Sequence, residues 1–197
     1  MSQNNNSYSL QKKILRKEIL EARDHLHPSE RELSSQAIAE RLLSSPFSVF
    51  FQKNAIISLY MPIRSEVDVR SLFPHVLDSG AVLALPTIET NHMTFRAWNG
   101  HVPLESAAFG LFQPSSTAES VIPDLILAPL CAFDQKCNRL GYGKGYYDQA
   151  LNTLKKYKKI KTIGLAFSIQ KVDHIPCESH DQPLDAVITE KELVFAS

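Results

Sequence analysis

The sequence predicts one α/β domain with a mainly parallel sheet between helices. Runs in which nearly every residue is apolar recur along the chain, as is typical of strands buried on both faces of a sheet; they are 55–60, 81–85, 125–128, 162–167 and 186–188. Helical patterns lie between these runs, and helices that alternate with buried strands indicate a layered fold. At 197 residues, of which 44% are hydrophobic, the chain is long enough for one such domain.

The N-terminal part predicts two helices after a polar leader. Residues 1–9 are Asn-rich, and we expect them to be a disordered leader before a single catalytic domain over 10–197. From Leu10 to about Leu26, apolar residues recur at helical intervals and leave one apolar stripe. A second helix is expected to begin at a capping box of Ser29 and Glu32 and to end near Leu43.

Further helices and one alternating segment complete the prediction. A helix over 69–78 separates the first two apolar runs, and another over about 146–159 separates the third and fourth. The last turn of this second helix is rich in lysine, which suits the negative end of a helix dipole. The alternating stretch 93–98 predicts an antiparallel or edge strand, and 99–123 is expected to be irregular.

Composition and charge narrow the class of protein. The 21 basic residues equal the 21 acidic ones, which argues against a nucleic-acid partner held by a basic surface. No apolar run approaches the ~20 residues of a membrane span, and no secretory signal is evident. Three cysteines without zinc-type spacing are typical of reduced thiols. We therefore expect a cytoplasmic monomer that acts on small molecules, with neither nucleic acid nor membrane as a partner.

The most informative segment is Arg139–Asp148, which places three of the chain's seven glycines at alternate positions. Glycines let a backbone approach an anion closely, and the helix expected directly afterwards presents unpaired N–H groups. Arg139 and Lys144 add positive charge within the same segment. The spacing of Gly141, Gly143 and Gly145 fits neither the Walker A motif nor the dinucleotide fingerprint. We interpret the segment as a phosphate-binding loop.

Two aspartates are candidate magnesium ligands. Asp148 closes the glycine segment, where a carboxylate also complements a helix dipole. Asp181 lies just before the last apolar run, and its structural alternative is a turn residue without a metal. A carboxylate beside a phosphate loop is well placed to hold the Mg²⁺ that bridges protein oxygens to nucleotide phosphates.

Other polar residues have both a structural and a functional interpretation. Lys12, Arg16 and Arg23 lie along one edge of the first helix. Such a row of cations is either a solvated helix face or a set of phosphate ligands. Glu66 and Asp68 follow the first apolar run, at the end of a parallel sheet where ligands bind. Asp68 has a structural role as a helix N-cap, so Glu66 is favoured as the acid that accepts hydrogen bonds from a substrate.

Several motifs in order resemble the 5-formyltetrahydrofolate cyclo-ligases, also called methenyltetrahydrofolate synthetases. The resemblance rests on the glycine segment, on the preceding 124–129 and 132–134, and on Lys12-x-x-x-Arg16. The tail from 164 to 190 is similar too. The likeness spans roughly 10–190, and the glycine segment is its most specific part.

This resemblance implies a Rossmann-like, three-layer α/β fold and an ATP-driven reaction. ATP would phosphorylate the formyl oxygen of 5-formyltetrahydrofolate, and ring closure would give 5,10-methenyltetrahydrofolate, ADP and phosphate. The implied ATP contacts are Lys12, Lys13, Ile14, Leu15, Arg16, Arg139, Leu140, Gly141, Tyr142, Gly143, Lys144, Gly145, Tyr146 and Tyr147. The implied folate contacts are Met61, Glu66 or Asp68, Tyr142, Gly143, Lys144, Gly145 and Tyr146. Asp148 and Asp181 would hold Mg²⁺, and Arg139 and Lys144 would be the catalytic cations.

One departure and two alternatives remain open at this level. The family usually has Glu-Pro where this chain has Gln113-Pro114, which removes a negative charge near the expected substrate. A dinucleotide-dependent oxidoreductase is disfavoured because the glycine loop comes late in the chain and not after the first strand. A nucleotide- or RNA-binding module without catalytic activity is disfavoured by the balanced charge.

Overall fold

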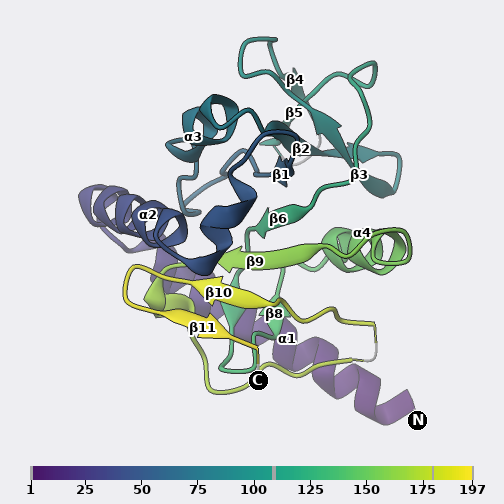
Figure 1. Ribbon diagram of the computed structural model, residues 1–197. Helices are drawn as coiled ribbons and strands as arrows, with labels where there is room; N and C mark the ends of the chain where they lie inside the picture. The colour runs from purple at the N-terminus through teal and green to yellow at the C-terminus, as the bar shows by residue number, and fades with distance from the viewer. Residues whose placement is uncertain (1, 108–109, 179, 197) are drawn as a thin grey trace.

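The computed structural model describes residues 2–107, 110–178 and 180–196 (Figure 1). A seven-stranded sheet forms its centre, in the order β11-β10-β9-β6-β1-β2-β3. Its strands are β1 (Ile56–Ser58), β2 (Val82–Glu89), β3 (His92–Ala97), β6 (Leu125–Ala128), β9 (Lys161–Leu165), β10 (Ala186–Ile188) and β11 (Leu193–Phe195). The inner neighbours are parallel, and antiparallel β3 and β11 form the two edges. The predicted α/β domain with a mainly parallel sheet is confirmed.

Burial on both faces explains why the inner strands are apolar at every position. In β6, Leu125 and Leu127 belong to one hydrophobic cluster, whereas Ile126 and Ala128 belong to another, and all four are 0% exposed. Successive side chains of a strand point to opposite faces, so a strand between two helical layers has no polar face. The edge strand β3 alternates, as the sequence predicted for 93–98.

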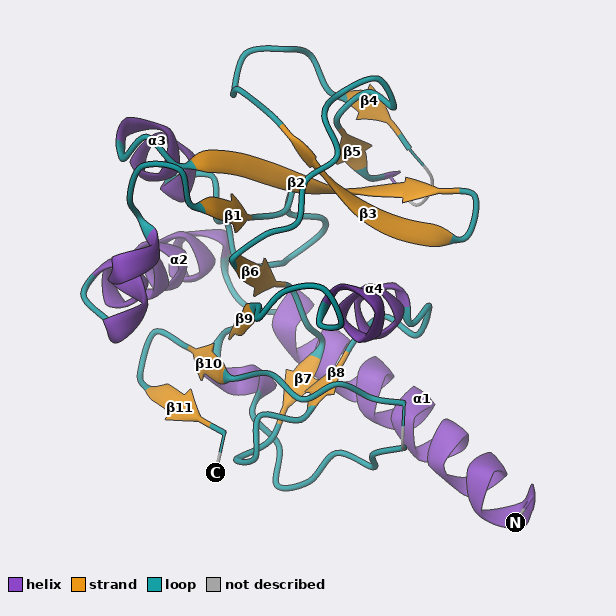
Figure 2. Ribbon diagram, turned by 45° about the vertical axis from the view of Figure 1, so that its right-hand side comes forward, coloured by secondary structure: helices purple, strands orange, loops and turns teal. Residues whose placement is uncertain are grey.

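Helices cover both faces of the sheet (Figure 2). Buried side chains of α2 (Pro28–Leu43) and α3 (Leu72–Asp78) join one cluster, and those of α4 (Tyr146–Leu154) join the other. The long helix α1 (Ser2–Asp24) contacts the short strand β7 (Ala132–Phe133) and the 3₁₀ turn at Ser168–Gln170. Two short hairpins complete the fold, β4 (Glu105–Ser106) with β5 (Phe112–Gln113) and β7 with β8 (Arg139–Leu140). The remaining element is a 3₁₀ helix at Pro46–Phe50.

The first two helices begin earlier than predicted. α1 starts at Ser2, so it runs through most of the segment expected to be a leader. α2 starts at Pro28, and the His27 ring caps it by accepting a hydrogen bond from the Ser29 N–H at 3.4 Å. The predicted capping box at Ser29 is wrong because the fixed φ of proline suits the first helical position.

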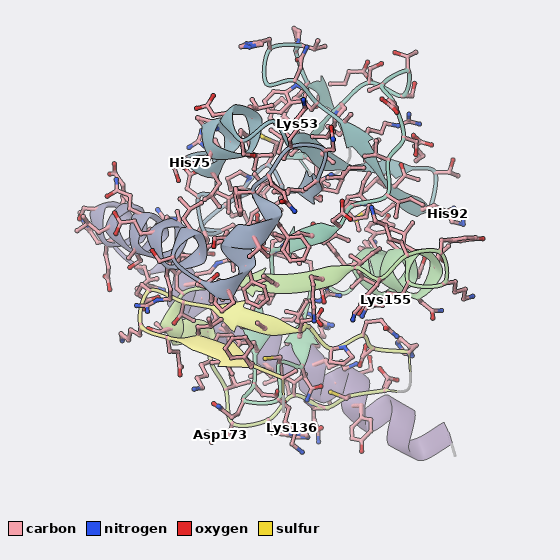
Figure 3. All side chains as sticks on the ribbon, viewed as in Figure 1. Lys53, His75, His92, Lys136, Lys155 and Asp173 are labelled. Carbon is pink, nitrogen blue, oxygen red and sulfur yellow. The ribbon has the colours of Figure 1, made fainter. Side chains whose placement is uncertain are left out.

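The other two helices are shorter than predicted. α3 begins at Leu72, because the Asp68 carboxylate accepts the Arg70 N–H in a local turn and caps no helix. α4 ends at Leu154, and the apolar face ends there too, since Tyr157 is 76% exposed. Most of the lysine-rich stretch therefore follows α4. Lys155 is the exposed C-cap of this helix (Figure 3). None of the helices in the described part of the chain is long and apolar enough to cross a membrane.

Candidate active site

The glycine loop leads directly from β8 into α4. Gly143 has φ +95 and Gly145 has φ +68, in the left-handed region that strains any residue with a Cβ. Gly145 is the N-cap of α4, and its carbonyl accepts the Gln149 N–H at 3.0 Å. The first turn of a helix carries N–H groups without intrahelical partners and a partial positive charge. The structure therefore has the loop-to-helix geometry that the sequence predicted, while anion binding there stays a prediction.

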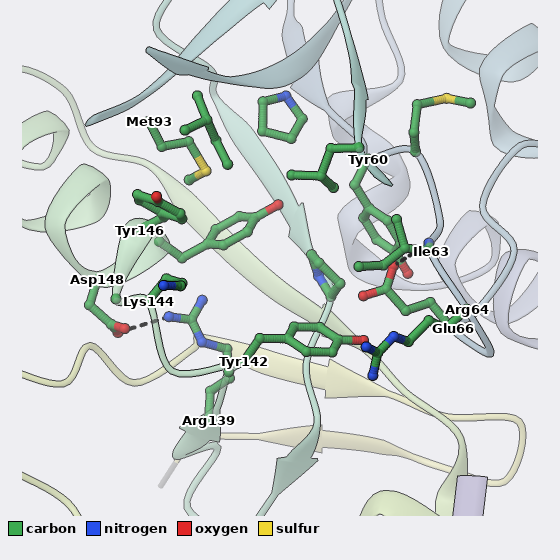
Figure 4. A pocket seen from close by; sticks show the side chains of 18 of the residues that line it. Tyr60, Ile63, Arg64, Glu66, Met93, Arg139, Tyr142, Lys144, Tyr146 and Asp148 are labelled. Carbon is green, nitrogen blue, oxygen red and sulfur yellow. Dashed lines mark hydrogen bonds and ion pairs between the residues drawn. The ribbon is translucent and has the colours of Figure 1, made fainter. Parts of the chain in front are cut away.

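This loop forms one wall of a cavity of about 270 Å³ (Figure 4). The wall opposite comes from the turn after β1, and a third wall comes from β2, β3 and the segment before β5. Most of the lining is apolar or aromatic, and the charged groups are Arg64, Glu66, Arg139, Lys144 and Asp148. A largely apolar cavity with a few convergent polar groups is the usual form of a small-molecule site. The other lining residues are Tyr60, Met61, Ile63, Pro86, Ile88, Met93, Leu111, Phe112, Pro129, Gly141, Tyr142, Gly145, Tyr146 and Tyr147.

Glu66 is the acid of the turn that follows β1. Its side chain is buried, and one carboxylate oxygen accepts the Ile63 N–H at 2.9 Å. Burial raises the Glu66 pKa, while the Ile63 N–H and the Tyr142 hydroxyl favour the carboxylate and oppose that rise. A hydrogen-bonded carboxylate in an apolar cavity can accept N–H groups of a planar ligand.

Arg139 lies between the glycine loop and α4, and its side chain is 2% exposed. One nitrogen donates to Asp148 at 2.8 Å, and the guanidinium lies 5.2 Å from the centre of the Tyr147 ring. Its Nε and Nη1 atoms are buried and have no hydrogen-bond partner within the described residues. Buried charged donors without acceptors are unfavourable, so these two Arg139 nitrogens could accept an additional anionic partner at little cost.

α1 lies beside the glycine loop. Arg16 Nε donates to the Gly141 carbonyl at 2.7 Å, and a Cβ on Gly143 would stand 3.4 Å from the Arg16 guanidinium carbon. Lys12 is buried and pairs with Asp181 at 2.6 Å and Glu178 at 2.8 Å. Burial alone would lower the Lys12 pKa, but the two carboxylates outweigh it and the pKa is raised. Arg16 thus borders the glycine loop, whereas Lys12 pairs with carboxylates of the 178–181 segment; ATP contact by either residue stays a prediction.

The two predicted magnesium ligands lie near each other. Asp148 Oδ1 accepts the backbone N–H of Gln182 at 3.1 Å, which joins the start of α4 to the segment that carries Asp181. Ligand atoms of Asp181, Glu178 and His180 all lie within 4.8 Å of one another. Carboxylate oxygens are the ligands that Mg²⁺ prefers, so Asp148 and the carboxylates of 178–181 suit this ion, but the group within 4.8 Å does not include Asp148.

Some predicted site residues lie outside the cavity lining. Asp68 forms an ion pair with Arg70 at 2.5 Å, and this contact lowers the Asp68 pKa. Lys13 and Ile14 are exposed on α1, and Leu15 packs against the small cluster that includes Leu140. The cavity lining contains Glu66 and not Asp68.

The departure from the family pattern at Gln113 has a structural explanation. Its side-chain oxygen accepts the backbone N–H of Ile88 at 3.0 Å, and Ile88 lines the cavity. A glutamate carboxylate can accept the same hydrogen bond, so either residue ties β5 to β2.

Sequence patterns reveal neither the apolar lining of the cavity nor the burial of Arg23. Pro86, Ile88 and Met93 come from strands that pack over the glycine loop, and their sequence signal is the same as that of ordinary core residues. Arg23 was placed in the row of candidate phosphate ligands, but it is 1% exposed and bonded to Tyr142 at 2.9 Å.

Fold and site together define an α/β protein with a small-molecule cavity and a glycine loop that leads into a helix N-terminus. The chain belongs to the 5-formyltetrahydrofolate cyclo-ligase family, which it matches over residues 8–190. It is therefore an enzyme of that ligase class, acting in one-carbon folate metabolism.

Individual relatives agree with this assignment. The 5-formyltetrahydrofolate cyclo-ligase of Haemophilus influenzae is 29% identical over 178 residues, covering 86% of this chain and 92% of the relative. The solution structure of the Aquifex aeolicus 5,10-methenyltetrahydrofolate synthetase has a TM-score of 0.78 at 35% identity, covering 94% of this chain and 92% of that one. The synthetase structure from Mycoplasma pneumoniae has a TM-score of 0.74 at 28% identity, covering 91% and 98%. The resemblance stated from the sequence is confirmed.

Proposed function

We propose that the chain uses ATP and Mg²⁺ to cyclise 5-formyltetrahydrofolate to 5,10-methenyltetrahydrofolate, with release of ADP and phosphate. One observation supports the nucleotide most directly: two buried donors of Arg139, which have no partner among the described residues, lie beside the N-terminus of α4. Phosphate oxygens are suitable acceptors for both features. Lys12, Arg16 and Lys144 add positive charge around the same loop.

The folate would occupy the apolar part of the cavity. Tyr142 and Tyr146 offer aromatic faces to a flat ring (Figure 4), and Met61 lines the same cavity. The Glu66 carboxylate would accept hydrogen bonds from the N–H and NH₂ groups of the pteridine. This arrangement brings the formyl group toward Arg139 and Lys144, the two cations proposed to be catalytic.

The chemistry needs alignment and charge stabilisation more than a protein nucleophile. The formyl oxygen attacks the γ-phosphorus, and the bond to ADP breaks. The substrate's amine nitrogen at position 10 then attacks the formyl carbon and loses its proton, and phosphate leaves with the former formyl oxygen. Burial raises the pKa of Cys131 to about 12 and that of Cys137 to about 11, so neither thiol is a nucleophile near neutral pH. Fixed cations and alignment can supply most of the rate in such a transfer.

Asp148 and Asp181 are the residues proposed to hold Mg²⁺. Each carboxylate is paired with a cation of the proposed nucleotide site, Asp148 with Arg139 and Asp181 with Lys12. When bound, the ion would neutralise phosphate charge. The chain itself favours the ionised form of Asp181, whose pKa is lowered: burial alone would raise it, but Lys12 and the Glu178 N–H outweigh that effect.

The test is the appearance of methenyltetrahydrofolate absorbance when the protein is mixed with 5-formyltetrahydrofolate, ATP and Mg²⁺. Omission of ATP or addition of a chelator should abolish the signal. A thermal shift with ATP and Mg²⁺, and none with NAD, is expected in parallel. Unchanged turnover after removal of ATP would overturn the proposed mechanism.

A further inference from the structure

Arg23 is a buried cation of α1 that contacts neither solvent nor the phosphate loop's anion-binding end. At 1.5 Å per residue along a helix, it lies about 16 Å from Lys12, too far to share a phosphate with that residue. The residue is 1% exposed, and its guanidinium donates hydrogen bonds on three sides. Nε donates to Ser65 at 3.0 Å, Nη1 to the Leu130 carbonyl at 3.4 Å and Nη2 to the Tyr142 hydroxyl at 2.9 Å.

These three acceptors come from the segments that build the proposed folate site. Ser65 precedes Glu66 in the turn after β1, and Tyr142 lies in the glycine loop. Figure 4 shows the Tyr142 ring lying between Arg139 on one side and Glu66 on the other. One buried side chain therefore joins opposite walls of the cavity.

Hydrogen-bond direction follows from the chemistry of the groups. A guanidinium only donates, so the Tyr142 hydroxyl must accept from Arg23 and has its single proton left for another partner. Burial raises the Tyr142 pKa, which keeps that proton in place. Figure 4 shows this hydroxyl on the side of the cavity where Glu66 lies, and the hydroxyl favours the ionised Glu66 carboxylate. A hydrogen bond therefore joins Arg23 to Tyr142, whose hydroxyl faces Glu66.

We propose that Arg23 is a positioning residue for folate binding: its hydrogen bond fixes the Tyr142 ring on the cavity wall, with the Tyr142 hydroxyl toward the Glu66 carboxylate. This inference rests on the proposed folate site. It predicts that Arg23 affects the folate and leaves ATP binding alone, whereas a phosphate ligand would do the reverse.

A substitution at Arg23 can remove the link while the other acceptors keep partners. The Leu130 carbonyl still accepts from Gln170 Nε2 at 2.7 Å, and Ser65 still donates to Asp24. Only the Tyr142 hydroxyl loses its donor. Arg23→Met is therefore expected to fold, with Arg23→Lys as a second variant that keeps the charge but not the three-sided geometry.

A matched control comes from Arg41 of α2. Its guanidinium donates to the carbonyls of Thr189 at 3.0 Å and Glu190 at 2.9 Å, and none of these residues lines the cavity. Arg41→Met therefore removes the same kind of contact between a helix and a loop. It should lower the Tm without changing either Michaelis constant.

The experiment measures KM for 5-formyltetrahydrofolate and for ATP in the wild type, both Arg23 variants, Tyr142→Phe, the double variant Arg23→Met with Tyr142→Phe, and Arg41→Met. A lost hydrogen bond to a charged group should raise the folate KM of Arg23→Met about 10- to 100-fold, with the ATP KM within about 2-fold. The double variant should be little worse than Tyr142→Phe, because both changes break one chain of bonds. Arg23→Lys should show a smaller rise in the folate KM.

Calorimetric binding of 5-formyltetrahydrofolate without ATP separates this inference from the proposed reaction. Weaker binding by Arg23→Met than by the wild type supports it even if turnover proves to follow another mechanism. An unchanged folate constant in Arg23→Lys, additive effects in the double variant, or an equal rise in the ATP constant would overturn it. A wild type that neither binds nor converts 5-formyltetrahydrofolate refutes the proposed function itself.

Discussion

Replacing Arg139 by methionine is expected to remove activity while leaving the free protein nearly as stable as before. The side chain is buried, with one ion pair to Asp148 and two donors without partners in the described chain. Methionine has a similar length and no charge. The substitution therefore separates what Arg139 contributes to folding from what it contributes to the reaction.

Two effects on stability oppose each other. Removing two buried donors without partners relieves about 1–3 kcal/mol for each. Leaving a fully buried carboxylate without its cation costs about 3–5 kcal/mol. Asp148 keeps the Gln182 N–H and its side chain is 20% exposed, so this cost falls below that range. We expect the free energy of unfolding to change by less than about 2 kcal/mol, and the Tm by less than about 8 °C.

The effect of Arg139→Met on the reaction rate should be larger than its effect on stability, and it should be a loss. A fixed donor at a developing charge is typically worth about 2.7–4 kcal/mol, which corresponds to a loss of about 10²–10³ in kcat. The stabilisation of the wild type by ATP and Mg²⁺ should also shrink, because a ligand stabilises only the state that binds it.

Thermal melts with and without ATP and Mg²⁺, together with initial rates of methenyltetrahydrofolate formation, test this reasoning. Arg139→Lys, which keeps a charge but lacks the planar fork, is the control and should recover part of the rate. Near-normal kcat in Arg139→Met would refute the catalytic assignment. A loss of stability far above 2 kcal/mol would show instead that the buried guanidinium is mainly structural.

Three further predictions concern single residues. Burial raises the Glu66 pKa above its ordinary 4.5. The stability of the wild type relative to Glu66→Gln should therefore fall as the pH rises through the raised pKa, and then level off. Thermal melts from pH 4 to 8 measure this difference, and a difference that does not change with pH contradicts the prediction. Gly143→Ala forces a Cβ into a backbone at φ +95 beside Arg16, so it should lower stability by about 1–2 kcal/mol and weaken ATP binding, as denaturation and calorimetry can check. Gln113→Glu should keep turnover within about 2-fold, since its carboxylate can accept the Ile88 N–H; a larger loss would show that the charge matters.

Local patterns were enough to predict the strands and the glycine loop. An uninterrupted apolar run such as 125–128 fits a strand buried on both faces, and this follows from side-chain burial alone. Glycines at 143 and 145 occupy left-handed conformations that the alternating spacing already indicated. The predicted helix boundaries were the main errors. There a proline, a local turn or the end of an apolar face decides where the helix begins or ends.

The chemical role of each charged residue could not be predicted from its neighbours in the sequence. Glu66 and Asp68 are two positions apart, yet one lines the cavity and the other pairs with Arg70. Lys12 and Asp181 meet across 169 positions of sequence. A contact between residues so far apart in the sequence cannot be predicted from any local periodicity.

The sequence by itself thus determined the α/β class, the family and the loop, because these depend on burial patterns and on residues that are neighbours along the chain. Only the tertiary structure decided which charges are paired, which are buried without partners, and that Arg23 lies beneath Tyr142. The physical reason is that the energy of a charge depends on the groups and solvent around it in space, and the packing of distant segments sets those surroundings.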